Sequence, residues 1–143
     1  MFSVDNQSRI PVYTQIMQQT ERFVLTGVLR RDDPLPSVRR LSETLSANAN
    51  TIQKAYTELD RRGITYSVPG KGIFISEGAS DIIKRGRVTE LKAIEHSAHE
   101  CALAEIPIEA ALEAVRRGYS AEKAGGGTVP QPAANNDTEG TEI

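Results

Sequence analysis

Short polar side chains between residues 48 and 57 offer hydrogen-bonding groups of the kind that reads the edges of DNA bases. Ile52, Ala55, Tyr56 and Leu59 recur at i, i+3, i+4 and i+7, which predicts a helix with one buried face. Its opposite face then presents amide, hydroxyl and ammonium groups, from Asn50, Thr51, Gln53, Lys54 and Thr57. Donors and acceptors at the start of a helix are typical of a recognition helix in the major groove.

Two capped helices are predicted in this region. Ser37 can cap a short helix whose apolar residues Val38, Leu41 and Leu45 share one face, and a tight polar turn follows it. Asn48 can cap the recognition helix. Together they predict a helix-turn-helix.

A ribbon is predicted directly after the recognition helix. Gly63 can end that helix in a left-handed conformation, and residues 64–68 and 73–76 read as strands joined by a glycine turn. Gly70 and Lys71 lie at the turn. The predicted fold class is mainly α with a small antiparallel β wing (α+β), a winged helix-turn-helix.

The flanking segments divide the chain into three parts. Residues 1–10 are predicted to be a short arm, followed by a helix over residues 12–26 that Gly27 ends. We place the winged domain at residues 1–76, a connector with a two-helix dimerisation or effector region at 77–123, and a disordered tail, rich in Gly, Pro, Asn and acid, at 124–143.

The two helices after the winged domain carry apolar stripes. One long helix is predicted from Asp81 to Glu105, Pro107 breaks it, and a short helix follows over residues 108–117 with Gly118 beyond its end. Two such helices cannot enclose a core, so their stripes must cover something, and a second copy of the chain is the simplest candidate. The residues predicted to form this dimer contact are Ile83, Leu91, Ile94, Ile108, Leu112 and Val115.

Composition limits the remaining possibilities. Residues 1–78 hold ten Lys and Arg against eight Asp and Glu, a balance of +2, and residues 79–143 hold seven against eleven, a balance of −4, so the basic excess lies in the winged part. The single Cys101 excludes an intrachain disulfide. We find no membrane span and no secretory signal, and therefore predict a cytoplasmic protein without a membrane partner.

Neither catalysis nor a cofactor has support in the sequence. No Ser-His-Asp arrangement, phosphate-binding loop, carboxylate pair or zinc motif is present, so we predict a protein that is not an enzyme and has no cofactor. His96, His99 and Cys101 suggest a metal or thiol site, but on a helix Cys101 lies off the face that the histidines share. We assign no metal site, and a site shared across a dimer is the alternative left open.

The ordered pattern resembles the amino-terminal domain of the GntR family of bacterial transcription regulators. The resemblance spans about half the chain and includes the element LPSVR at residues 35–39 and the wing at its proper separation. The matching residues are Pro11, Tyr13, Gln15, Ile16, Gly27, Leu29, Leu35, Pro36, Ser37, Arg39, Leu41, Leu45, Asn48, Thr51, Ala55, Tyr56, Leu59, Gly63, Gly70, Gly72 and Ile75. The short carboxyl-terminal part resembles the YtrA-type branch, in which two helices serve mainly to form a homodimer. Larger effector domains of other branches need more residues than are available here.

The resemblance implies DNA contacts at several positions, and the simpler readings are helix capping alone for Asn48, helix-start propensity for Thr51 and a solvated side chain for Gln53. Arg39 matches an arginine that contacts a phosphate or a guanine edge, and Asn48 matches a residue that caps the helix and contacts phosphate. Gln53 is the favoured base reader, because glutamine can pair with adenine through two hydrogen bonds. Thr51 is a phosphate or base contact, and Asn50 and Lys54 are weaker candidates, with Lys54 better suited to phosphate.

At the wing, Gly70 and Lys71 resemble a minor-groove tip, where a cation meets negative potential. An ordinary hairpin turn would need the glycines anyway. Two departures from the family pattern are Ala49, in place of an arginine or proline, and Asp32 with Asp33, in place of a glycine. They imply an operator that differs from those of relatives.

The sequence thus predicts a homodimeric DNA-binding transcriptional regulator, a repressor, on double-stranded DNA with an inverted-repeat operator. An unidentified small-molecule effector is left open as a partner. The alternatives are a non-enzymatic protein-interaction module and a metal- or thiol-responsive DNA-binding sensor.

Overall fold

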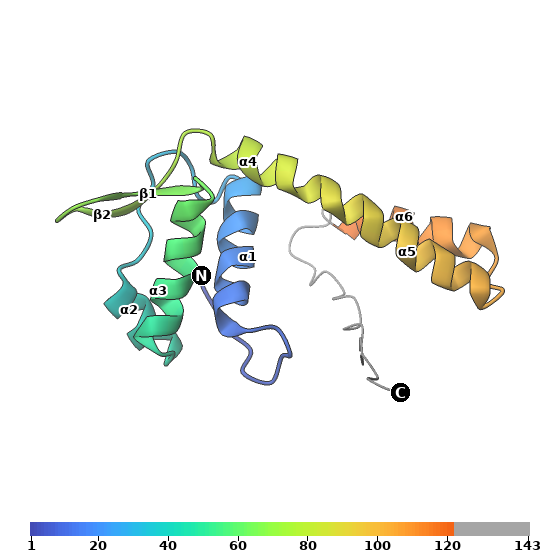
Figure 1. The fold of residues 1–143 in the computed structure, drawn as a ribbon, viewed down its shortest axis with the longest axis horizontal. Coiled ribbons are helices and arrows are strands. Elements are labelled where there is room, and N and C mark those ends of the chain that lie inside the picture. The colour runs from blue at the N-terminus through green and yellow to red at the C-terminus, as the bar shows by residue number, and fades with distance from the viewer. Residues whose placement is uncertain (122–143) are drawn as a thin grey trace, which may run out of the picture. The chain divides into compact units, whose positions relative to one another are not determined.

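Helices dominate the computed structural model, which describes residues 1–121 (Figure 1). The elements are α1 (Val12–Leu25), α2 (Val38–Leu45), α3 (Ala49–Arg61), β1 (Thr65–Val68), β2 (Gly72–Ile75), α4 (Ala79–Gly86), the 3-10 turn η1 (Arg87–Thr89), α5 (Glu90–Leu103) and α6 (Ile108–Ala121). The predicted fold class, mainly helical with a small antiparallel wing, is confirmed. The tail predicted to be disordered lies outside the described residues.

The core of the first unit, Met1–Val88, lies where α1 meets α3 and α4, with α2 against the other side of α3. The α3 residues predicted to be buried, Ile52, Ala55, Tyr56 and Leu59, are at most 1% exposed. Burial of this apolar stripe, rather than helix propensity, holds so short a helix in place.

The predicted starts of α2 and α3 and the predicted end of α3 are confirmed. Ser37 Oγ accepts a hydrogen bond from the Arg40 N–H (3.1 Å), and Asn48 Oδ1 accepts one from the Asn50 N–H (2.8 Å), so both side chains cap the helices that follow them. Gly63 takes a φ of +79°, and the Ile64 N–H donates to the Leu59 carbonyl. This is the left-handed helix stop that a glycine permits at low cost.

The wing is an antiparallel pair in which Thr65 faces Ile75 and Val68 faces Gly72. Pro69 and Gly70 are the central residues of its turn, Gly70 has a φ of +73°, and the Lys71 N–H donates to the Val68 carbonyl (3.0 Å), as in a type II turn. The segment 32–35 runs beside β2 and exchanges backbone hydrogen bonds with Ile73 and Ile75. The loop before α2 therefore serves as a third, irregular strand.

The predicted arm packs on α1. The Gln15 side chain bonds to both the N–H and the carbonyl of Asp5, each at 2.9 Å, and Gln19 bonds to both groups of Ser3. Phe2 is buried against Phe23 in an edge-to-face pair. Two glutamines on successive turns of one helix thus hold residues 2–5 in place.

The prediction of one continuous helix from Asp81 to Glu105 is wrong. Gly86, a weak helix former, ends α4, and η1 separates α4 from α5. The first unit extends to Val88, beyond the predicted boundary at Ser76, because Ala79 and Ile83 of α4 are buried in its core. Ile83 is 1% exposed, so it fills this core and is not available to a second copy of the chain.

The second unit, which begins at Thr89, contains the hairpin of α5 and α6, and these two helices contact each other. Glu105 has a φ of +57°, and the Ile106 N–H donates to the Cys101 carbonyl (2.9 Å), which ends α5 in the manner usually served by glycine. Gly118 lies inside α6, contrary to the predicted stop at that residue, and has no positive φ. A glycine within a helix costs only about 1 kcal/mol relative to alanine, so the helix continues through it.

Candidate nucleic-acid interface

The outward face of α3 is the polar face that the sequence predicted. Asn50, Gln53 and Thr57 follow each other at i, i+3 and i+7 and are all exposed. Thr51 lies at the edge of this stripe and is half-buried, so less of its side chain can be reached by a ligand. The exposed residues present both donors and acceptors along one line, as reading of base edges requires.

Gln53 is held along the helix by its neighbour one turn on. Its Nε2 donates to Thr57 Oγ1 at 3.2 Å, and both side chains are exposed. Such a contact between exposed groups at i, i+4 contributes only about 0.2–0.5 kcal/mol. Gln53 can therefore leave Thr57 at small cost and offer its amide oxygen and nitrogen to another partner.

Lys54 points to a different side of the helix. Its ammonium nitrogen lies 3.9 Å from the centre of the Tyr13 ring, which belongs to α1. This cation–π contact holds the charge at the boundary between α3 and α1 and away from Gln53. The placement suits a phosphate contact better than a base contact.

The remaining helix candidates, Asn48 and Arg39, differ in how much of their side chains is engaged. Asn48 uses its carbonyl oxygen to cap α3, so its side-chain NH₂ group is the part available for a phosphate. Arg39 of α2 is 89% exposed in its side chain and is paired with Glu43 one turn on, Nε to Oε1 at 3.1 Å. An exposed pair of this kind is worth about 0–1 kcal/mol, so Glu43 does not prevent Arg39 from meeting DNA.

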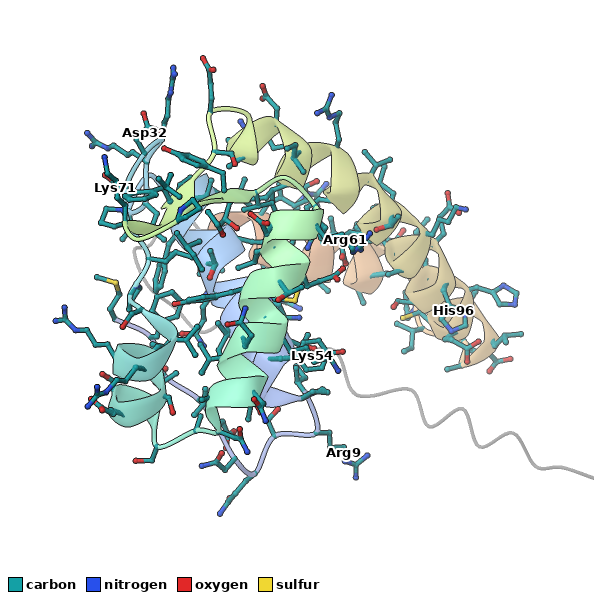
Figure 2. The ribbon with its side chains drawn as sticks, turned by 60° about the vertical axis from the view of Figure 1, so that its left-hand side comes forward. Arg9, Asp32, Lys54, Arg61, Lys71 and His96 are labelled. Atoms are coloured by element: carbon teal, nitrogen blue, oxygen red, sulfur yellow. The ribbon has the colours of Figure 1, made fainter. Side chains whose placement is uncertain are left out.

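Gly70 and Lys71 lie at the wing turn, and Figure 2 shows Lys71 at the end of the ribbon, well apart from Lys54 on α3. An added Cβ at Gly70 would meet no atom within 4 Å, so its positive φ, rather than crowding, calls for glycine there. The turn therefore needs glycine for its backbone alone, and the exposed Lys71 beside it is free to meet DNA as a separate matter.

The base of the wing is braced by an interaction that the sequence did not suggest. Tyr66 of β1 stacks on Phe74 of β2 with ring centres 5.6 Å apart, and its hydroxyl donates to Asp32 Oδ1 (2.7 Å). This hydrogen bond raises the pKa of the Tyr66 hydroxyl. Asp32 holds this position with a φ of +65°, a left-handed conformation that aspartate tolerates better than most residues.

Tyr56 confirms its predicted role beneath α3. The side chain is 1% exposed, and its hydroxyl donates to the Pro36 carbonyl at 2.7 Å. Burial raises the pKa of this hydroxyl, which stays neutral and remains a donor. Tyr56 thereby ties α3 to the turn that begins α2.

The carboxyl-terminal end of α3 carries arginines that are engaged within the chain. Arg61 binds Glu58 through two hydrogen bonds, which lower the pKa of that carboxyl group. Arg62 binds the buried Glu21 of α1. The cations at this end of α3 therefore serve the fold, whereas Lys54 and the polar stripe lie nearer its amino-terminal end.

The predicted dimer residues of the second unit are exposed. No residue of α5 or α6 is buried, and the side chains of Leu91, Ile94, Ile108, Leu112 and Val115 are between 38% and 67% exposed. Cys101 is half-buried, and His96 and His99 are exposed on α5. Among residues 1–121, no group of three or more His, Cys, Asp or Glu side chains is placed to hold a metal ion.

Three contacts near the interface escaped prediction from the sequence. Tyr13 beneath Lys54, Asp32 beneath Tyr66 and Glu21 beneath Arg62 each join residues at least 34 positions apart. An opposite charge or an aromatic ring is present in each case, but nothing in a single sequence selects the partner.

Comparison with known proteins agrees with this geometry. Residues 12–75 match the family model described as bacterial regulatory proteins, gntR family. The HTH-type transcriptional repressor YtrA of Bacillus subtilis (strain 168) is 42% identical over 92 residues, which cover 64% of this chain and 71% of YtrA. The family match runs from the start of α1 to the end of β2.

Solved structures share this fold. A protein described as a transcriptional antiterminator from Listeria monocytogenes EGD-e superposes with a TM-score of 0.70 at 28% identity, over 92% of this chain and 98% of its own. A GntR family transcriptional regulator from Listeria monocytogenes gives a TM-score of 0.64 at 29% identity, over 80% of this chain and 98% of its own. Both coverages exceed the 88 residues of the first unit, so the likeness includes part of the second. No helix among the residues described here is long and apolar enough to span a membrane.

Proposed function

Because the chain belongs to the GntR family of bacterial regulatory proteins and is a DNA-binding transcriptional regulator, we propose that it acts as a repressor that binds an inverted-repeat operator as a homodimer. The repressor YtrA supports the direction of regulation, since it is similar over most of its length. In this proposal the protein acts in the cytoplasm, where its operator lies.

The exposed polar stripe of α3 is the observation that carries the DNA contact. Asn50, Gln53 and Thr57 face outward from a helix whose other side is fully buried, so the helix can enter a major groove without disturbing the core. We assign base reading to Gln53, with Asn50 beside it. Phosphate contacts are assigned to Arg39, Asn48, Thr51 and Lys54.

The wing adds a contact of another kind. Lys71 next to Gly70 presents one cation at the end of a ribbon that is braced by Tyr66 and Asp32. A narrow minor groove concentrates negative potential, which attracts such a cation without a hydrogen bond to a base edge. We therefore assign Lys71 to affinity and Gln53 to specificity.

Apolar stripes on α5 and α6 support the homodimer. Ile108, Leu112, Val115 and Tyr119 recur at i, i+4, i+7 and i+11 on α6, and all four are exposed. Leu91 and Ile94 continue through Ala98 and Cys101 on α5 at i, i+3, i+7 and i+10. Stripes with this spacing pack against each other in helical bundles, so two hairpins together would form a four-helix bundle.

A homodimer of this kind predicts the form of the operator. Two identical winged units related by a two-fold axis read the same bases in opposite directions, which makes the operator an inverted repeat. Half-sites are then separated by about 10 to 10.5 base pairs, one turn of DNA, or by multiples of that distance.

The test is binding of the purified protein to DNA upstream of its own gene, at several salt concentrations, against an unrelated fragment. Selective binding that weakens with salt, two protected half-sites related by a dyad and a sedimentation mass of two chains are expected. Transcription from that DNA in vitro should fall when the protein is added. Equal weak binding to both fragments, or a single chain in sedimentation, would contradict the proposal.

A further inference from the structure

The amino-terminal arm forms a fixed loop where it enters α1. The Asp5 carboxylate accepts a hydrogen bond from the Gln7 N–H (2.9 Å), and the Ser8 hydroxyl accepts one from the Ile10 N–H (3.2 Å). From α1, the buried side chain of Gln15 donates to the carbonyls of Asp5 and Ile10, each at 2.9 Å. A single glutamine therefore ties together the two ends of the loop.

This loop carries a guanidinium group that has no partner in the fold. Arg9 is exposed, and its side chain makes no ion pair or hydrogen bond within residues 1–121. Figure 2 shows Arg9 below Lys54, with its side chain extending away from the ribbon. Arg61 and Arg62, by contrast, are engaged by glutamates. Arg9 is thus a cation that the fold itself does not use.

Contacts between α1 and α3 place the loop beside the start of the recognition helix. Lys54 of α3 lies over the ring of Tyr13 in the first turn of α1. Arg62, just after α3, binds Glu21 in the carboxyl-terminal half of α1. The two helices therefore run in the same direction, with their amino-terminal ends together. Arg9 precedes Tyr13 by four residues, so their Cα atoms are at most about 14 Å apart.

Arg9 and Arg39 lie on different sides of α3. In Figure 1, α2 and α1 are on opposite sides of α3, and in Figure 2 Arg9 and Lys54 are across α3 from α2, which carries Arg39. A helix with its side chains is about 10–12 Å across and the major groove about 12 Å wide, so phosphates of both strands border an inserted helix. The α2 side of α3 then meets one row of phosphates, and the α1 side meets the other.

We propose that the amino-terminal arm is a further DNA contact, in which Arg9 binds a backbone phosphate across the major groove from the phosphate met by Arg39. This inference rests on the proposed placement of α3 in that groove. A guanidinium group grips a phosphate through two parallel hydrogen bonds. Because Gln15 and Gln19 hold the arm on α1, Arg9 is presented beside α3 and little conformational entropy is lost on binding.

The experiment uses the full chain with Arg9→Ala, and Arg22→Ala is the matched control. Arg22 is also exposed, and its side chain likewise makes no ion pair or hydrogen bond within residues 1–121. It lies ten residues beyond Val12 on α1, which places it about 15 Å from the start of that helix and away from the arm. Arg9→Lys is the variant that keeps the charge.

Binding is measured by fluorescence anisotropy on a single operator half-site and on unrelated DNA, at several salt concentrations. Arg9→Ala should weaken binding to both and lower the slope of log K against log salt by about 0.9 per subunit. Its loss of affinity relative to the parent should then shrink about 3.5-fold between about 50 and 200 mM salt. Arg9→Lys should keep the parent slope, and Arg22→Ala should match the parent in slope and affinity.

The phosphate is located with half-sites in which one phosphate at a time is replaced by an uncharged methylphosphonate. One replacement should weaken the parent and leave Arg9→Ala unaffected. Another should weaken the parent and leave Arg39→Ala unaffected. The two positions should lie on different strands, across the major groove from each other. Thermal unfolding of Arg9→Ala should equal that of the parent, because Arg9 has no partner within residues 1–121.

The inference is overturned if Arg9→Ala keeps the parent slope and affinity, or if its phosphate lies on the same strand as that of Arg39. The placement of α3 is tested separately by Gln53→Ala. If Gln53→Ala loses base preference at one position while Arg9→Ala has no effect, α3 reads the major groove and only the arm contact fails. If neither variant changes binding, both the placement of α3 and the arm contact fail.

Discussion

Replacement of Gln53 by alanine tests the assignment of base reading to α3. A bidentate contact between glutamine and adenine discriminates against the wrong base by about 1–3 kcal/mol. In the unbound protein the same amide donates to Thr57 at 3.2 Å, and giving up this contact offsets about 0.2–0.5 kcal/mol of the gain. Gln53→Ala should therefore cost about 0.5–2.8 kcal/mol per half-site, a factor of about 2 to 110 in affinity for the preferred base.

The assay compares the parent and the variant on operators in which each base pair of one half-site is replaced in turn. Gln53→Ala should lose discrimination at a single position and keep it at all others. Thr57→Ala is the matched control, since it removes the hydrogen-bond partner of Gln53 without touching its amide. It should leave the preference at that position intact.

Lys71→Ala is the contrasting test, because it should weaken binding to every DNA sequence equally. Loss of one cation from the DNA surface weakens binding to all operators alike and lowers the slope of log K against log salt by about 0.9 per subunit. Our reasoning about the interface is refuted if Gln53→Ala weakens all sequences equally, or if Lys71→Ala changes the preference at one base pair.

Three further changes test the framework beneath the interface. Tyr56→Phe leaves the Pro36 carbonyl without its donor and should lower the free energy of unfolding, measured by thermal denaturation, by about 1–3 kcal/mol. The control Tyr66→Phe, at the exposed wing, should change it little. Gly63→Ala places a Cβ on a residue with a φ of +79°, 3.3 Å from Ile82 Cδ1, and should lower the free energy of unfolding by about 1–2 kcal/mol. Its control is Gly78→Ala, which should be near neutral because Gly78 has a φ of −89° and open space around the added Cβ. Leu112→Asp places a charge on the exposed stripe of α6 and should shift the sedimentation mass from two chains to one without lowering single half-site affinity.

Local chemistry explains why the winged segment could be predicted closely. A cap needs an oxygen one residue before a helix, as at Ser37 and Asn48, and a left-handed stop needs a residue such as Gly63. Each of these signals depends only on residues that are close to it in the sequence. The predicted ends of α2, α3 and the wing strands accordingly lie within one residue of those in the structure.

Contacts across the fold could not be predicted in the same way. Arg62 follows α3 at its negative end, where a cation is expected, yet its partner Glu21 lies 41 positions earlier and nothing in the sequence distinguishes it from the other acidic residues. The same holds for Asp32, where the missing glycine was visible but the hydroxyl of Tyr66 that reaches it was not. Charge and residue type define what could pair, and only the packing of α1, α3 and the wing selects the pair.

Two residues of one predicted apolar stripe differ in burial, which shows the limit of predicting contacts from helical periodicity. Ile83 and Leu91 lie at near-helical spacing, and a single helix would give both the same partner. In the structure Ile83 is 1% exposed in the core and Leu91 is 57% exposed, with η1 between them. A 3-10 turn advances about 120° per residue and an α-helix about 100°, so a stripe cannot be extended through such a turn. The residue that opens this turn is Arg87, bound to Glu21, and the place where the periodic pattern fails is therefore also the place where the winged unit ends and the connector begins.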